Sequence, residues 1–155
     1  MTTDIKQVEL LLQKCFDIVN EEIQRGLSIL GEKCVTKVRD RGYDESWFDQ
    51  TGNLRSSIGY AIYNHGKKMI ESAFAVVKNG GEGANEGRRM VEELAKMYSE
   101  TYALVVLAGM NYAENVERME NKDVLASTEL WAKTQVDEHI KNSMKRAIQR
   151  INKEL

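Results

Sequence analysis

The most conspicuous absence in this sequence of 155 residues is proline, of which it contains none. Because proline breaks or kinks helix interiors, a chain without it suits a helix-rich protein, although the absence identifies no function. Cysteine is also scarce, with only Cys15 and Cys34. Both fall in one predicted helix, about 28 Å apart, which excludes a disulfide within that helix. We expect two buried free thiols, which fit either a reducing cytoplasm or the absence of any redox constraint.

The sequence also lacks a surplus of positive charge and any long hydrophobic run. Its net charge of −2 gives no electrostatic reason to expect sequence-specific nucleic-acid binding. The basic residues between positions 141 and 153 alternate with apolar ones at helical spacing, which predicts a solvated helix face. No apolar stretch reaches the length of a membrane span and the first residues lack a signal-peptide core, so we expect no membrane partner and no secretion by the general route. With 42% apolar and 30% charged residues, residues 1–155 are predicted to form a single globular domain.

Recognisable catalytic and metal-binding motifs are likewise missing. The glycine-rich residues 78–87 lack the Gly-Lys-Ser/Thr ending of a phosphate-binding loop, and no serine lies in a Gly-x-Ser-x-Gly turn. His65 has no cysteine or second histidine near it in the sequence, and His139 is expected to be exposed. The adjacent acids Glu21 and Glu22 point about 100° apart on a helix, so they form no facing pair. We therefore expect no enzyme, no catalytic residue, no metal and no cofactor.

What the sequence does contain is a long amphipathic helix over residues 3–39. Its stripe is spaced by three or four residues: Val8, Leu12, Cys15, Val19, Ile23, Leu27, Leu30, Cys34 and Val38. Thr3 or Asp4 is the predicted N-cap, and Gly26 and Gly31 predict a kink or a close neighbour. A helix of about 55 Å exceeds what so small a domain needs, so either it is broken or part of it packs on another subunit.

Residues 49–77 predict a β-hairpin. Alternating residues from Leu54 to Tyr63 suggest one half-buried strand, and residues 69–76 suggest a second. Asn64, His65 and Gly66 lie in the connecting turn, where we expect a contact with a partner. In the preceding loop, residues 43–50, Trp47 and Phe48 either anchor the loop to the core or make a second partner contact.

The remaining elements complete an α+β fold. We predict a flexible loop from residue 78, a helix over residues 86–100 capped by Asn85, and a buried strand over residues 101–109. Residues 112–123 suggest a short helix or an irregular crossing, and residues 125–154 a second long helix capped by Ser127 or Thr128. The expected architecture is a small antiparallel sheet built on a β-hairpin, packed by long N- and C-terminal helices plus a short middle helix. Surplus amphipathic helix of this kind also predicts an oligomer.

Three stretches resemble one family of tailed-phage proteins. They read TGNLRSSIGYAIY (residues 51–63), LVVLAGMNYAENVE (residues 104–117) and KDVLAST (residues 122–128), followed by a C-terminal helix. This succession, with its Tyr-Ala and Val-Glu pairs at positions 112–113 and 116–117, is similar to the HK97 gp10-like head–tail connector and tail-completion proteins. The chain departs from the family pattern after Glu117, where many members carry glycine and a proline-containing segment. The glycine-rich stretch and middle helix, residues 78–100, also exceed what the smallest members carry.

The resemblance implies a structural role in virion assembly without catalysis. The protein would form a ring, as a hexamer, that binds other head–tail or tail proteins, in the virion and, during assembly, in the host cytoplasm. Two other classes stay open from the residues alone: a cellular α+β interaction or adaptor protein, and an enzyme with a site that no motif marks.

Overall fold

The predicted α+β fold is confirmed by a computed structural model that describes residues 4–40, 51–110 and 124–155. Its helices are α1 (Ile5–Arg39), α2 (Asn53–Ser56), α3 (Gly81–Leu94), the 3-10 helix η1 (Ala95–Tyr98) and α5 (Ala126–Glu154). Its strands are β1 (Ile58–Asn64), β2 (Lys67–Glu71) and β3 (Tyr102–Ala108). The loop predicted over residues 43–50, with Trp47 and Phe48, and the short helix or irregular crossing predicted over residues 112–123 both lie outside the described residues. No helix in the described ranges is long and apolar enough to cross a membrane.

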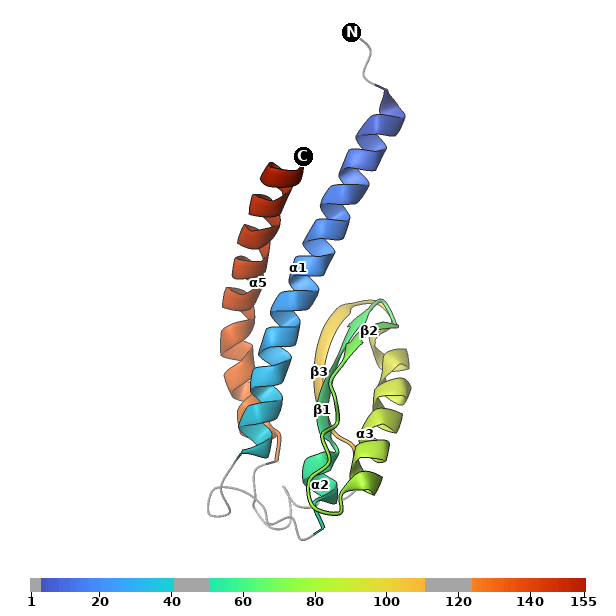
Figure 1. Cartoon of the computed structure of the whole chain (residues 1–155), viewed down its shortest axis with the longest axis vertical. Helices are drawn as coiled ribbons and strands as arrows, with labels where there is room; N and C mark the ends of the chain where they lie inside the picture. The colour runs from blue at the N-terminus through green and yellow to red at the C-terminus, as the bar shows by residue number, and fades with distance from the viewer. Residues whose placement is uncertain (1–3, 41–50, 111–123) are drawn as a thin grey trace.

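The chain is layered, with β1 at the centre of the sheet. The strand order is β2-β1-β3, and both pairings are antiparallel. Figure 1 shows α1 on one side of the sheet and α3 on the other, with α5 beyond α1. The first interface buries Leu27, Ile58 and Ile62, and the second buries Tyr63 and Phe74. Since helices cover both faces, β1 is buried along both, and the expected half-buried strand is wrong.

The hairpin begins later and ends earlier than its alternation suggests. Residues 53–56 form α2 instead of the start of a strand, after a turn in which Gly52 has a φ of +82°. β2 starts at Lys67, two residues before the predicted position, and ends at Glu71. Beyond it, the Ser72 hydroxyl accepts a hydrogen bond from the Tyr60 amide, and the Ser56 hydroxyl accepts one from the Val77 amide. The Ser72 amide also donates to the Tyr60 carbonyl at 2.9 Å, so backbone and serine hydroxyl bonds together hold the segment that follows β2.

The middle helix corrects a second expectation, because α3 begins at Gly81, inside the predicted loop. Its glycines pack against neighbouring backbone and rings. A Cβ on Gly83 would lie 1.9 Å from the Asn53 carbonyl oxygen, and one on Gly87 would lie 2.4 Å from the Phe74 ring. The Asn53 side chain also accepts a hydrogen bond from the Gly83 amide. These glycines are contact positions in a helix, so the flexible loop predicted over residues 78–87 is wrong from residue 81 onward, and only residues 78–80 form a turn.

The long N-terminal helix is unbroken over its 35 residues, so a break does not explain its length. The Asp4 side chain caps it by accepting from the Lys6 amide, as predicted. Gly26 and Gly31 do have close neighbours, on α5 and at the Tyr60 ring respectively. Cys34 is buried as expected, whereas Cys15 is half-buried, and both are free thiols.

The C-terminal helix has Leu125 at its N-cap position, so the predicted caps Ser127 and Thr128 both lie inside the first turn. It runs antiparallel to α1, with which it shares a long interface (Figure 1). A Cβ added to Gly26 would lie 2.1 Å from the Ser143 hydroxyl of α5, so the two helices approach closely there. This close approach fixes how far each helix extends past the other.

Candidate functional site

The hairpin tip, where we expected a partner contact, is tied to the chain just before β3. The His65 amide donates to the Thr101 carbonyl at 2.9 Å, and the Gly66 amide donates to the Tyr98 carbonyl at 3.0 Å. The His65 ring is exposed, with Nδ1 2.6 Å from the Asn64 side-chain oxygen. The tip is therefore held in place by its backbone, while the His65 side chain is exposed and Asn64 is half-buried. A partner contact at Asn64, His65 and Gly66 stays a prediction.

The other histidine lies between the two long helices. His139 is half-buried on α5, which corrects the expectation of an exposed residue. Burial lowers the pKa of its imidazole, and the nearby Lys33 ammonium acts in the same direction. The neighbouring Ser143 hydroxyl donates to the His139 backbone carbonyl at 2.8 Å, not to the ring. Within the three described ranges, no cluster of three or more His, Cys, Asp or Glu side chains could hold a metal.

A buried ion cluster at the α1–α5 interface is a feature that sequence reasoning missed. The Glu22 carboxylate is only 4% exposed and accepts from Arg146 Nε at 2.7 Å and from Arg150 at 3.1 Å. The hydrogen bond from Arg146 is the main reason that the pKa of Glu22 is lowered, against the opposing effect of burial. Arg150 also reaches Glu21 at 2.9 Å. Two of the basic residues predicted to face solvent are therefore turned inward to Glu22.

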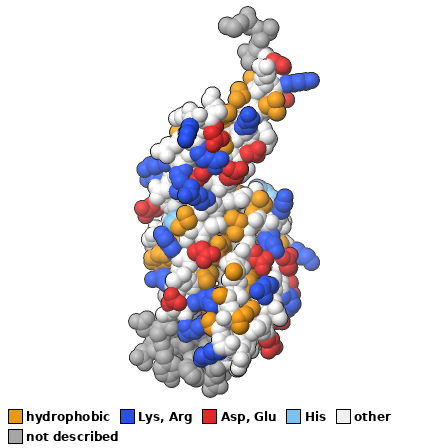
Figure 2. All heavy atoms as spheres, viewed as in Figure 1, with side chains coloured by type: hydrophobic (Ala, Val, Ile, Leu, Met, Phe, Trp, Pro, Cys, Tyr) orange, Lys and Arg blue, Asp and Glu red, His pale blue; other side chains and the backbone are white. Residues whose placement is uncertain are grey.

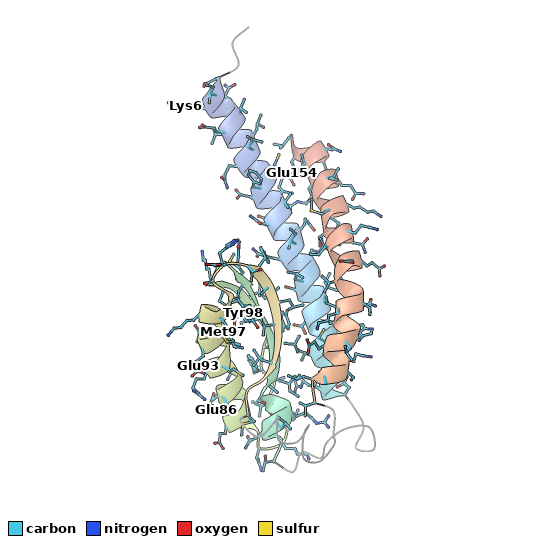
Figure 3. The ribbon with its side chains drawn as sticks, turned by 180° about the vertical axis from the view of Figure 1, so that it is seen from behind. Lys6, Glu86, Glu93, Met97, Tyr98 and Glu154 are labelled. Atoms are coloured by element: carbon cyan, nitrogen blue, oxygen red, sulfur yellow. The ribbon has the colours of Figure 1, made fainter. Side chains whose placement is uncertain are left out.

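The first turns of α1 form an exposed apolar surface, which we call the free end of α1 (residues 5–16). Every residue from position 4 to 14 is exposed. Six large apolar side chains are at least one-third exposed there: Ile5 (73%), Val8 (39%), Leu10 (65%), Leu11 (47%), Leu12 (53%) and Phe16 (61%). In Figure 3, Lys6 lies well beyond Glu154, the last residue of α5, along the direction of α1. Figure 2 shows hydrophobic side chains among charged ones on this narrow end. Its surface is far more apolar than a solvated helix requires.

Lower on the molecule, an apolar groove runs between β3 and α5, with α1 as its floor. It has a volume of about 690 Å³. The floor residues are Ile23, Leu27, Leu30 and Cys34; Tyr102, Leu104 and Val106 form one wall; Leu125, Ala132, Val136 and Ile140 form the other. Figure 3 shows the side of the molecule on which β3 and the first half of α5 lie near α1.

The groove exists because β3 is an edge strand and α5 packs on α1, not on the sheet. Its charged side chains are the exposed Lys133 and Glu129, which pair at 2.8 Å. Burial raises the pKa values of the Cys34 thiol and the Tyr102 hydroxyl, so both groups are neutral at pH 7. Such a lining suits an apolar occupant.

Comparison with models of protein families, with curated proteins and with solved structures finds no match for this chain. Of the predicted contact residues, the structure describes three at the hairpin tip and brings them beside Tyr98 and Thr101. The free end could have been found from the sequence, because the apolar stripe of residues 3–39 continues at helical spacing into the first turns of the helix. The groove had no such signal, because its walls come from separate parts of the chain.

Proposed function

We propose that this protein is a non-enzymatic assembly component of a tailed phage or prophage, acting as a head–tail connector or tail-completion ring. The observation that carries the self-association part is the free end of α1, whose apolar side chains are exposed although the helix is unbroken. Because such a surface is costly to leave in water, it is expected to be covered in the assembled state. The ring would also bind neighbouring head–tail or tail proteins.

The phage part of the proposal is supported by the resemblance of residues 51–63, 104–117 and 122–128. In the structure, the first of these stretches has a packing role. Gly59 lies against the Phe74 ring, Ser57 donates to the Leu54 carbonyl at 2.7 Å, and Asn53 contacts α3. Residues that pack the fold and carry no chemistry are what we expect in a family whose role is structural.

The proposal is tested by interrupting the gene in a lysogen and examining the induced particles by electron microscopy. A connector or tail-completion protein predicts full-size heads and tails that do not join, and the particles should be rescued by the gene supplied in trans. Intact infectious particles without the protein would contradict the proposal. Neighbouring genes for a portal, a major capsid protein and a tail tube protein would separate the virion role from that of a cellular adaptor.

A further inference from the structure

The two long helices share an apolar face that no other described element covers. Its members follow one another at steps of three or four residues along each helix, so they lie on one side of it. On α1 they are Ile5, Val8, Leu12, Phe16 and Val19, and on α5 they are Met144, Ile148, Ile151 and the terminal Leu155. We call these nine residues the two-helix face. Those of α5 that are at least one-third exposed are Met144 (37%), Ile148 (54%) and Leu155 (49%).

The two stripes lie on the same side of the helix pair. The α1 stripe reaches Ile23 one turn after Val19, and the α5 stripe follows Ile140 by one turn. Ile23 and Ile140 both pack against the core cluster that lies between α1 and the sheet. In Figure 1, α1 and α5 continue beyond the end of the sheet. The two-helix face is therefore the side of the helices that meets the sheet, extended past the point where the sheet ends.

Charge is confined to the other side of these helical turns. None of the nine positions of the two-helix face is charged. Lys14, Glu21 and Lys153 each follow a member of the face by two positions, which is about 200° around a helix. A helix pair that is solvated on both sides would carry polar residues on both. The contrast between the two sides indicates that the apolar one is a contact surface.

We propose that the two-helix face packs against the same face of a second copy, so that four helices form an antiparallel bundle. Helix pairs with apolar stripes at this spacing pack in bundles of this kind. The sheet covers the rest of the same side of α1, so parallel copies would bring their two sheets together. Antiparallel copies place the sheets at opposite ends. This inference rests on the self-association part of the proposed function and not on the phage role.

The exposed area suffices for a specific dimer. Seven of the nine side chains are at least one-third exposed, and on average about half of each is accessible. At roughly 150 Å² for a fully exposed large apolar side chain, they present roughly 550 Å² per copy. An isologous contact counts this area twice, which gives about 1,100 Å² before the half-buried Val19 and Ile151 are included. A specific interface needs about 1,000 Å².

An isologous contact closes at two copies, so it is separate from the contact that would propagate a ring. A helix of a different protein docked on the two-helix face is the competing arrangement. It would leave this chain monomeric in isolation, whereas the bundle requires no second kind of chain. The mass of the purified protein therefore distinguishes the two.

The experiment uses single substitutions in the full chain. Phe16→Asp and Ile148→Asp each place a charge on the two-helix face, one on each helix, at positions that are already exposed. Leu10→Asp is the matched control, because Leu10 is 65% exposed and follows Val8 by two positions, on the opposite side of α1. Dimer dissociation constants are measured by light scattering over a series of protein concentrations, and folding is checked by circular dichroism.

The wild type and Leu10→Asp should form dimers with similar dissociation constants. Phe16→Asp and Ile148→Asp should each raise the dissociation constant at least about tenfold, because an isologous contact contains every substitution twice. A wild type that is monomeric at about 1 mM would overturn the proposal. So would a face variant that dimerises like the wild type, a Leu10→Asp as weak as Phe16→Asp, or larger assemblies that keep their mass in both face variants.

If Ile148→Asp does not fold, Leu155→Asp, at the end of the same stripe, is held to the same outcomes. Interrupting the gene in a lysogen tests the phage role in whole particles, whereas these masses test the contact in solution. Either can fail without the other: particles that lack joined tails together with a monomeric protein would reject only the bundle, and a dimer together with intact infectious particles would reject only the phage role.

Discussion

The Glu22 carboxylate on α1 and the Arg146 guanidinium on α5, 124 positions apart in the chain, meet at 2.7 Å. This contact lies one turn from the close approach of Gly26 to Ser143. A buried charge is tolerated only where its partners are in place, so the pair penalises any sliding of α5 along α1. The contact thereby determines how many turns of α1 extend past the end of α5, and hence how long the free end is.

Replacing Glu22 by glutamine should destabilise the fold by about 2–3 kcal/mol, because two arginines lose a charged partner at a buried position. The measurement is the free energy of unfolding from urea denaturation. Glu21→Gln is the matched control, since its side chain is 62% exposed and its pairing with Arg150 should contribute less than about 1 kcal/mol. Equal effects of the two substitutions would show that Glu22 is not the centre of the cluster.

The lowered pKa of Glu22 also predicts that the free energy of unfolding decreases at acid pH. The pKa of Glu22 is lowered in the folded protein below its ordinary value of 4.5, mainly by Arg146. Its contribution to stability is therefore fully present above pH 4.5 and is lost as the pH falls through the folded-state pKa. Unfolding free energies measured from pH 6 to pH 3 should converge for the wild type and Glu22→Gln. A difference that stays constant over this range would contradict the assignment.

The sequence predicted the order and type of the main elements because their apolar periods are long and regular. Residues 3–39 and 125–154 each repeat the helical spacing over many turns, and residues 101–109 form a continuous apolar run. Local sequence therefore sufficed for α1, β3 and α5. The alternation of residues 54–76 predicted the hairpin but not its limits, since α2 occupies the predicted start of the first strand and β2 already ends at Glu71.

Features that depend on distant residues could not be predicted in this way. Glu22 looked like one of two adjacent surface acids, because its partners lie on another helix. The groove arises from the placement of α5 relative to β3, which no local period encodes. The glycines of residues 78–87 were interpreted as loop residues, whereas Gly83 and Gly87 allow α3 to approach Asn53 and Phe74. Composition alone does not distinguish a glycine that bends the chain from one that admits a neighbour.

Substitution by alanine distinguishes a glycine of α3 that contacts its neighbours from one that has open space around it. Gly83→Ala should destabilise the protein by about 1–3 kcal/mol, because its Cβ would meet the backbone of Asn53, which cannot move aside easily. Gly81→Ala, in the same helix, has open space around the new Cβ and should be neutral or stabilising by up to about 1 kcal/mol. Urea denaturation of both variants gives the comparison. A stabilising Gly83→Ala would indicate that residues 81–87 behave as a loop and not as the packed start of α3.

The Tyr63 hydroxyl connects the sheet to α3 by donating to the Val91 carbonyl at 2.6 Å, in a buried position. Tyr63→Phe should therefore destabilise the fold by about 1–2 kcal/mol, because the Val91 carbonyl loses this buried donor. The ring itself stacks on Tyr98 with centroids 5.8 Å apart, so phenylalanine keeps that contact. A variant as stable as the wild type in urea would argue against this hydrogen bond.

Alkaline titration tests the surroundings of the same hydroxyl by a second route. Burial is the largest cause that raises the pKa of Tyr63 from 10 to about 12, and the Glu92 carboxylate adds to it. A raised pKa means that the neutral phenol contributes stability below pH 10, and that this contribution is lost as the pH rises toward 12. Between these values the wild type should lose stability more steeply than Tyr63→Phe, whose side chain does not ionise. Absorbance at the phenolate band should show one tyrosine fewer titrating near pH 12 in the variant, and parallel stability curves would contradict the burial of this group.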